Sequence, residues 1–398
     1  MKINKYTALA FNTFFLIPIA AIPFIIVQLK RGSDKGVILF LSLFTGVLSM
    51  RYVPSFTNDK VRYIERSNIF SSFSIQDLFE YYISVSRPDY VFDFLIFLYS
   101  KLKIDIRFFF FCITALSIYV SLNAIKKILQ SSTETKFRYN IIVLILFITA
   151  FSVPAVLSGL RYFLAGSIYL WFIYFFIFRK NYLLSSLLLT ISILTHFSYS
   201  LVTIAILISL TNPQDRLLKP ILLLSTAFFL VPESFSTNIL SLLPTPEIYI
   251  NKVELYTTYE FDNSINSIIL NFIKSAWYFF ALIYLFFKNH KGNKSLYYMC
   301  LVLAVIINLM YPFQIVFFRY ISFYKIIFAI YLAYLSLTSQ ISNKSFYFFI
   351  FLYLLGFIID IFILRINLLT SYLSTDNILL FTSFLNKEGL YDFLYYVD

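Results

Sequence analysis

Four side chains that can carry positive charge stand out because each lies at or near the end of an apolar stretch. They are Arg51, Arg161, His196 and Arg319. A charge at membrane depth costs about 2.5–3.5 kcal/mol on insertion scales, so such residues usually pair or line a cavity. Arginine suits phosphate because its planar fork donates two parallel hydrogen bonds. If these four groups share one depth, they predict a site for an anionic ligand.

Acidic residues in the segment 53–104 could act on a ligand that the cations hold. A carboxylate beside an arginine-bound phosphate is a candidate general base toward a hydroxyl, and we single out Asp59 and Asp89. Each of these residues also has a simpler interpretation, since a carboxylate often serves only a local salt bridge and a lone arginine often extends to the lipid headgroups. The sequence has no acidic trio and no HExxH or CxxC pattern, so we expect no metal and no cofactor.

The composition indicates that the solvent around most of this chain is lipid. Of 398 residues, 60% are hydrophobic and 13% are charged, against about 25% charged in a soluble domain. With only 8 glycines, a glycine-rich phosphate loop is not expected. The net charge of +12 comes from residues between apolar runs, which is typical of topology-setting loops and gives no reason to expect nucleic acid binding.

The lengths of the apolar runs predict an all-α bundle. A transmembrane helix needs about 20 apolar residues, and the sequence offers about 12 such runs in what we expect to be a single integral membrane domain, 1–398. The run 182–211 is long for one helix and short for two, and His196 lies where it would break. The amphipathic segment 89–103 is expected to lie along the membrane surface. The predicted spans are 6–29, 36–52, 105–125, 139–157, 160–178, 182–198, 199–211, 217–232, 267–287, 295–311, 314–336 and 345–365.

The charges of the loops predict how this bundle is oriented in the membrane. Alternate loops hold fifteen Lys and Arg residues against three acids, so the positive-inside rule places those loops in the cytoplasm. Both termini and two long loops, 53–104 and 233–266, then lie on the external side. This orientation brings all four cationic side chains to the external ends of their helices. We therefore predict one anionic site at the outer membrane surface.

Several stretches together resemble the EpsG/Wzy group of bacterial polysaccharide polymerases over about residues 36–335. Two departures are visible, because the acid follows Pro88 and Tyr162 stands where Gln is common. The stretches that carry the resemblance are Arg51-Tyr52 with Asn58-Asp59 and Tyr63, Pro88-Asp89-Tyr90-Val91-Phe92, Gly159-Leu160-Arg161-Tyr162 with Ala165, Thr195-His196-Phe197-Ser198, and Phe318-Arg319-Tyr320.

The resemblance implies a metal-independent glycosyltransferase in the bacterial inner membrane with a GT-C-like helical fold and a long external loop after the second span. Such proteins join undecaprenyl-pyrophosphate-linked oligosaccharide repeat units on the outer face of that membrane. The acceptor sugar hydroxyl attacks the anomeric carbon of the donor, and undecaprenyl pyrophosphate departs. The implied partners are these lipid-linked oligosaccharides, membrane lipids and a chain-length regulator protein.

On this hypothesis Arg161 and Arg319 bind the pyrophosphate and Arg51 assists them, because a reaction without a metal needs protein charges to stabilise the leaving group. Asp59 and Asp89 are candidate bases, and His196 is either the base or a hydrogen-bond donor to phosphate. Three alternatives remain open: a flippase or transporter of lipid-linked oligosaccharide, a membrane acyltransferase that modifies the polysaccharide, and a transferase that adds one sugar. A transporter site belongs near the midplane, whereas the predicted cations gather at one face.

Overall fold

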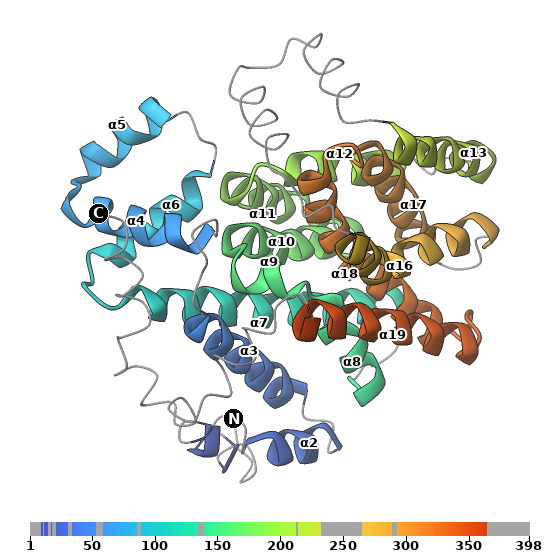
Figure 1. Cartoon of the computed structure of the whole chain (residues 1–398), viewed down its shortest axis with the longest axis horizontal. Helices are drawn as coiled ribbons and strands as arrows, with labels where there is room; N and C mark the ends of the chain where they lie inside the picture. Colours follow the sequence, from blue (N-terminus) through green and yellow to red (C-terminus); the bar gives the residue numbers. More distant parts are fainter. Residues whose placement is uncertain are drawn as a thin grey trace. The chain divides into compact units, whose positions relative to one another are not determined.

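Every regular element that the computed structural model describes is a helix (Figure 1). The all-α prediction is therefore confirmed for the described part of the chain, in which no strand occurs. The structure describes residues 9–10, 12–14, 17, 21–30, 34–52, 59–85, 89–133, 139–211, 214–231, 265–288 and 293–363. The predicted external loop 233–266 lies outside these residues except for its last two positions.

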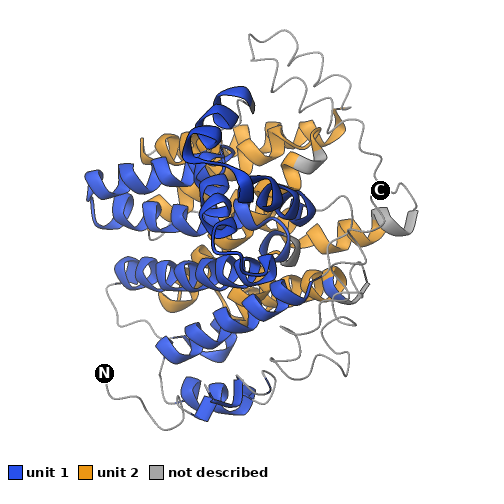
Figure 2. Cartoon of the chain, turned by 90° about the vertical axis from the view of Figure 1, so that its left-hand side faces the viewer, with its two compact units in different colours: residues 1–144, 153–199, 361–398 blue, residues 145–152, 200–360 orange. Residues whose placement is uncertain are grey.

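The chain divides into two compact units (Figure 2). Unit 1 comprises residues 1–144, 153–199 and 361–398, and unit 2 comprises residues 145–152 and 200–360. The single integral membrane domain stays a prediction.

Unit 1 is built around the long helix α7 (Ile106–Thr133), which packs against α3 (Asp34–Arg51) and α10 (Leu160–Ile173). The π-helix η2 (Tyr174–Phe178) continues α10. Trp171 of α10 fixes this packing by donating from its indole nitrogen to the carbonyl of Val120, at 3.0 Å. The remaining helices of the unit are α2 (Ile22–Lys30), α4 (Asp59–Ser72), α5 (Ile75–Val85), α6 (Tyr90–Ser100), α9 (Val153–Leu157) and α11 (Tyr182–Thr195).

The segment 53–104, expected as a long loop, is largely helical because its sequence carries helix-start signals. Ser74 and Asp77 form a capping box at the start of α5, with the Ser74 N–H donating to the Asp77 carboxylate at 2.6 Å. The same hydrogen bonds lower the pKa of Asp77. In α6, Phe92 and Ile96 are fully buried while Phe94 and Leu98 are exposed. The amphipathic character of this helix is confirmed, and its place at the membrane surface stays a prediction.

The break predicted at His196 is confirmed. Helix α11 ends at Thr195, His196 takes an extended backbone conformation, and α12 (Tyr199–Leu210) starts three residues later. One run of apolar residues therefore forms two short helices. Tyr199 secures the corner within unit 1, because its hydroxyl donates to the carbonyl of Tyr162 at 3.2 Å.

Unit 2 gathers the C-terminal helices around α18 (Gln314–Leu337), which is mostly buried. A hydrogen-bonded chain joins three of its helices: Tyr278 donates to Asn308 at 2.6 Å, and Asn308 donates to Ser225 at 2.8 Å. Hydrogen bonds between helices stabilise their packing in a membrane, where burial of apolar side chains adds little because the lipid is itself apolar. The other helices are α13 (Asp215–Ser225) with η3 (Thr226–Leu230), α16 (Ile265–Phe287), α17 (Lys294–Leu309) and α19 (Asn343–Ile358) with η4 (Ile359–Ile363); α8 (Ile141–Ala150) and α12 fall largely in this unit.

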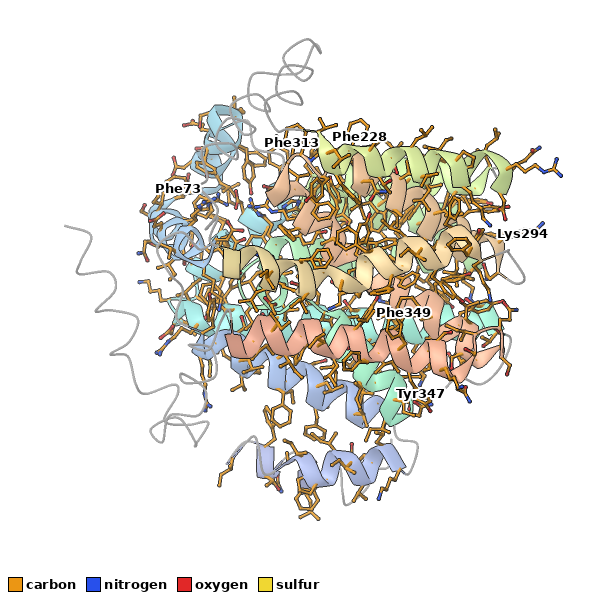
Figure 3. The ribbon with its side chains drawn as sticks, turned by 45° about the vertical axis from the view of Figure 1, so that its right-hand side comes forward. Phe73, Phe228, Lys294, Phe313, Tyr347 and Phe349 are labelled. Atoms are coloured by element: carbon orange, nitrogen blue, oxygen red, sulfur yellow. The ribbon has the colours of Figure 1, made fainter. Side chains whose placement is uncertain are left out.

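Side chains on α19 and around α17 give unit 2 its inner and outer faces. On α19, the Tyr347 ring is exposed and the Phe349 ring is buried, and Figure 3 labels both. Phe349 packs edge-on against Tyr284 of α16, with ring centroids 5.5 Å apart. The same view labels Lys294, the first residue of α17, and Phe313, which follows the other end of that helix.

Among the described residues, five helices are long and apolar enough to cross a membrane, as expected of a membrane protein. These spans are Ile106–Thr133, Leu160–Phe178, Ile269–Phe287, Val316–Leu337 and Asn343–Ile361. Five shorter apolar helices accompany them. Some helices follow the predicted runs closely, as at 160–178 and 314–336. Others differ: the predicted run 139–157 forms the two helices α8 and α9, and α7 continues to Thr133, past the predicted end at 125. The number of about 12 crossings and the GT-C-like arrangement stay predictions.

Candidate functional site

Arg161 and Asp89 form an ion pair across unit 1. Arg161 is the second residue of α10 and Asp89 directly precedes α6, 72 positions earlier in the chain. The Arg161 Nη1 lies 2.5 Å from the Asp89 Oδ2, and both side chains are largely buried. The two residues that the sequence assigned to different roles, a phosphate binder and a base, are thus direct partners.

A second buried ion pair lies one helical turn along α6. Asp93 follows Asp89 by four residues and therefore shares its face of the helix. Arg66 of α4 donates to Asp93 at 2.5 Å, and the two side chains are only 10% and 3% exposed. Two carboxylates on α6 are therefore matched by two arginines, one from α4 and one from α10.

Tyr63 lies among these charges with its hydroxyl unsatisfied. The residue is 1% exposed, and no partner for its hydroxyl exists among the described residues. Burial first, and then the negative charge of Asp59, raise the pKa of Tyr63 above its ordinary value, so the hydroxyl keeps its proton and can donate. The Arg161 Nε is also buried without a partner. An unpaired buried donor costs about 1–3 kcal/mol, which a bound acceptor would recover.

The site rests on an apolar base that joins α4, α6, α7 and α10. The Tyr63 and Phe92 rings lie 4.9 Å apart between centroids, and Phe92 in turn packs edge-on against Phe109 of α7 at 5.9 Å. Leu160, the residue before Arg161, belongs to the same buried cluster. Because this base is closely packed, it fixes the starting points of the helices that carry the ion pairs.

Lys60 connects the site to the end of α3, where Arg51 lies. The Lys60 side chain is fully buried and its ammonium group donates to the carbonyl of Ser49. The same group lies over the rings of Tyr52 and Phe110, at 5.0 and 4.7 Å from the ring centroids. Burial lowers the pKa of Lys60 well below its ordinary value. Arg51 is the last residue of α3, so this contact holds it near the start of α4.

His196 adjoins Arg161 through the next residue, Tyr162. The Tyr162 and His196 rings meet edge to face, with centroids 5.3 Å apart. The His196 Nδ1 accepts the backbone N–H of Ser198 at 3.3 Å and lies 2.6 Å from the Ser198 hydroxyl. A neutral imidazole that accepts at Nδ1 carries its proton on Nε2, so Nε2 is a donor. Of the two roles left open for His196, this arrangement favours the phosphate donor over the base.

The other predicted site residues are distributed between the two units. Asp59 is the first residue of α4 and lies 3.4 Å from Arg62 of the next turn, with a carboxylate that is 23% exposed. Asp59 also interacts electrostatically with Arg161. Arg319 lies in α18 and so belongs to unit 2. Unit 1 therefore collects Arg51, Asp59, Asp89, Arg161 and His196, five of the six predicted site residues.

The sequence analysis did not identify three residues of this site. Arg66 and Lys60 were not singled out at all, and Tyr63 was noted only as part of a motif. All three lie in the segment taken as an external loop. The available signal was the apolar spacing of Tyr63, Ile64 and Phe70, which are all buried on α4. If this spacing is interpreted as a helix, it places Arg66 and Tyr63 on the helix face that packs against α6.

If the reaction is the one that the resemblance implies, His196→Gln should slow polysaccharide extension, and Ser198→Ala should have a smaller effect in the same direction. Glutamine cannot reproduce the ring geometry that directs Nε2, whereas loss of the Ser198 hydroxyl leaves its backbone N–H to orient the imidazole. Complete loss of one charge-stabilising donor typically costs about 10²–10³ in rate, and the effect of His196→Gln should be smaller, because glutamine keeps a displaced amide donor. The measurement is polysaccharide chain length on a gel at matched membrane protein levels. Wild-type chains from His196→Gln would remove this residue from the site.

In chemical terms the site offers donors for an anion next to carboxylates, at the start of a candidate span. The first turn of α10 presents Arg161 where a helix N-terminus adds partial positive charge, and Gly159 caps it without a side-chain hydrogen bond. No group of three or more metal-ligating side chains occurs among the described residues, and metal independence stays a prediction.

Comparison with known proteins agrees with these motifs. The model of the EpsG family matches residues 36–374, which covers most of the chain and extends past the resemblance seen in the sequence. No curated protein and no solved structure matches the sequence. The match includes every residue of the ion-paired site in unit 1 as well as Arg319. The chain belongs to the EpsG family.

Proposed function

We propose that this protein is a polysaccharide polymerase that joins lipid-linked repeat units on the outer face of the bacterial inner membrane. The donor is the growing chain on undecaprenyl pyrophosphate and the acceptor is a second lipid-linked unit. An acceptor hydroxyl oxygen forms the new bond to the anomeric carbon while the bond from that carbon to the pyrophosphate oxygen breaks. The pyrophosphate leaves with the electron pair, and a base takes the hydroxyl proton.

The observation that carries this proposal is the state of Arg161. Asp89 holds the guanidinium through Nη1, while Nε is buried and has no partner in the part of the chain that the structure describes. Such a group is oriented before the ligand arrives and keeps a donor for a phosphate oxygen. Charge that develops on a departing pyrophosphate is stabilised most by donors already in place, because they need no reorganisation during the reaction.

The neighbouring residues have distinct roles in this scheme. Asp89 positions Arg161, while the Tyr63 hydroxyl and the His196 Nε2 are further donors near the phosphate. Asp59 is our candidate for the base, because its carboxylate is partly exposed and its arginine neighbour, at 3.4 Å, is a longer contact than those of Asp89 and Asp93. A general base must reach the proton that it removes either directly or through one water. The partial exposure of the Asp59 carboxylate permits such contact.

Arg51 and Arg319 complete the proposal. Arg51 ends α3 and adds positive charge to the C-terminal end of that helix, where it could assist pyrophosphate binding. We keep Arg319 as a second phosphate ligand. It lies in the sixth position of α18 and thus near the end predicted to be external. The proposal also retains the GT-C-like bundle of about 12 spans as its scaffold.

Deletion of the gene tests the reaction class against the alternatives. A polymerase mutant should carry single repeat units on the cell surface and no long chains. A flippase mutant would leave the repeat unit facing the cytoplasm, and an acyltransferase mutant would keep long chains of lower mass. The measurement is gel analysis of surface polysaccharide together with its mass, after complementation restores the parent pattern. Long chains in the deletion strain would contradict the proposal.

A further inference from the structure

Unit 2 contains a second group of charges that no step above uses. Lys274, Lys325 and Asp360 each lie within a candidate span: Ile269–Phe287, Val316–Leu337 and Asn343–Ile361. Ionisable side chains inside spans are costly, and they usually mark a ligand or ion pathway. Two positive charges accompany one negative charge here. Among the described residues, the group therefore has one more basic than acidic side chain.

The ion pair in this group is positioned by a glycine. Lys274 of α16 donates to Asp360 at 2.6 Å, 86 positions along the chain. Gly356 of α19, one turn before Asp360, faces the Lys274 backbone so closely that an added Cβ would lie 2.8 Å from the Lys274 carbonyl oxygen. Glycine thus permits a close crossing of α16 and α19. The crossing places Asp360 against Lys274.

Lys325 of α18 is held by aromatic rings and has no carboxylate of its own. Its ammonium nitrogen lies 4.9 Å from the Tyr353 ring centroid and 5.8 Å from that of Trp277. Tyr353 also donates its hydroxyl to the Lys325 carbonyl at 2.9 Å. Among the described residues, no ion pair includes Lys325. Cation–π contact stabilises a desolvated ammonium group by about 2 kcal/mol without neutralising its charge.

Lys274, Lys325 and Asp360 lie close together in unit 2. Tyr353 and Gly356 are three apart on α19, and Lys274 and Trp277 are three apart on α16, so each pair lies on one helix face. Asp360 follows in the π-helix η4, which continues α19. Lys274 and Asp360 both interact electrostatically with Lys325. Asp360 is 6% exposed, whereas the Lys274 side chain is 27% exposed. Lys274 is thus the group through which a ligand could approach.

We propose that Lys325 and Lys274, with Asp360 as the balancing carboxylate, form a binding site for a phosphate group in unit 2. A phosphate group would place a negative charge beside Lys325 and accept from both ammonium groups, which bind phosphate as point charges. The phosphate belongs either to a lipid headgroup or to free phosphate. The proposal is independent of the polymerase reaction, since none of its residues has a role there.

The test measures ligand binding to the purified full chain in uncharged detergent by native mass spectrometry. The probes are dioleoyl phosphatidic acid, undecaprenyl phosphate, inorganic phosphate, and dioleoylglycerol as the neutral lipid. All are applied to wild type and to an Arg161→Gln background, so that binding at Arg161 is separated from binding in unit 2. A lipid source requires phosphatidic acid or undecaprenyl phosphate to exceed inorganic phosphate, and a free-phosphate source requires the reverse.

Lys325→Gln should weaken phosphate binding about 10- to 100-fold in both backgrounds. Lys288→Gln is the matched control, because Lys288 also lies over a tyrosine ring in unit 2 and donates to a backbone carbonyl, and it should bind as wild type does. Asp360→Asn removes the competing carboxylate and should tighten binding, an effect that a purely structural ion pair would not produce.

Lys325→Arg keeps the charge and should retain binding, which covers the case in which Lys325→Gln does not fold. Equal binding of dioleoylglycerol and the phosphate probes would overturn the proposal. So would equal binding by Lys325→Gln and wild type, or weaker binding by Asp360→Asn. Because chain extension is not measured, failure here leaves the polymerase proposal untouched, and failure of that proposal leaves this one untouched.

Discussion

Arg161→Lys should reduce the rate of polysaccharide extension about 10²–10³-fold while the protein remains at normal levels in the membrane. Lysine keeps the positive charge that Asp89 requires, so the buried carboxylate is not left alone. It loses the planar fork, and with it the Nε donor that is unpaired in the structure. Chain length on a gel, at matched protein levels, measures the effect.

Arg107→Lys is the matched control for this prediction. Arg107 also pairs with an aspartate in unit 1, since its Nη2 lies 2.6 Å from Asp105. That pair is local in sequence and has no unsatisfied Nε, because Nε donates to Asp105 at 2.9 Å. Arg107→Lys should therefore give long chains. Equal chain lengths from the Arg161 and Arg107 variants would show that a bidentate arginine is not needed at position 161.

Arg66→Met should destabilise the protein by about 3–5 kcal/mol, because it leaves the Asp93 carboxylate buried without its partner. Adding Asp93→Leu should recover most of that loss, since a buried ion pair and an apolar pair of similar volume are often comparable in stability. The measurement is the free energy of unfolding in detergent for both single variants and the double variant. The double variant should unfold with a free energy close to that of wild type.

The interaction free energy from this cycle is the informative quantity. Asp93 is 3% exposed and Arg66 is 10% exposed, so the two single losses should be strongly non-additive. If the decreases in the free energy of unfolding of the two single variants simply add in the double variant, Arg66 and Asp93 do not act as a pair. The Arg62–Asp59 contact, between more exposed side chains, should give a coupling of about 0–1 kcal/mol in a parallel cycle.

The sequence predicted the helices well where length and hydrophobicity decide the structure. A helix in lipid must satisfy its own backbone, so apolar runs translate into helices with little dependence on their neighbours. The run 160–178 and the break at His196 are examples in which the predicted and observed bounds coincide. The family resemblance used residues at the ends of these runs and in the segment 53–104, and it was confirmed by the family match.

Tertiary pairing could not be predicted in the same way. Arg161 meets Asp89 from 72 positions away and Lys274 meets Asp360 from 86 positions away. No local spacing relates such partners, and one sequence carries no covariation. The helix that carries Tyr63 and Arg66 was also not predicted, because the polar composition of this segment is typical of a loop. Only the structure shows which residues of α4 form its buried face.

The central claim is tested most directly by the purified protein with a lipid-linked repeat unit as its sole substrate. The wild-type protein should yield a ladder of lipid-linked products that grow by whole repeat units and should release undecaprenyl pyrophosphate. The Arg107→Lys variant should give the same ladder, and Arg161→Lys should leave the substrate almost unchanged. A wild-type protein that forms no product longer than its substrate, or an Arg161→Lys variant with the full ladder, would contradict the account.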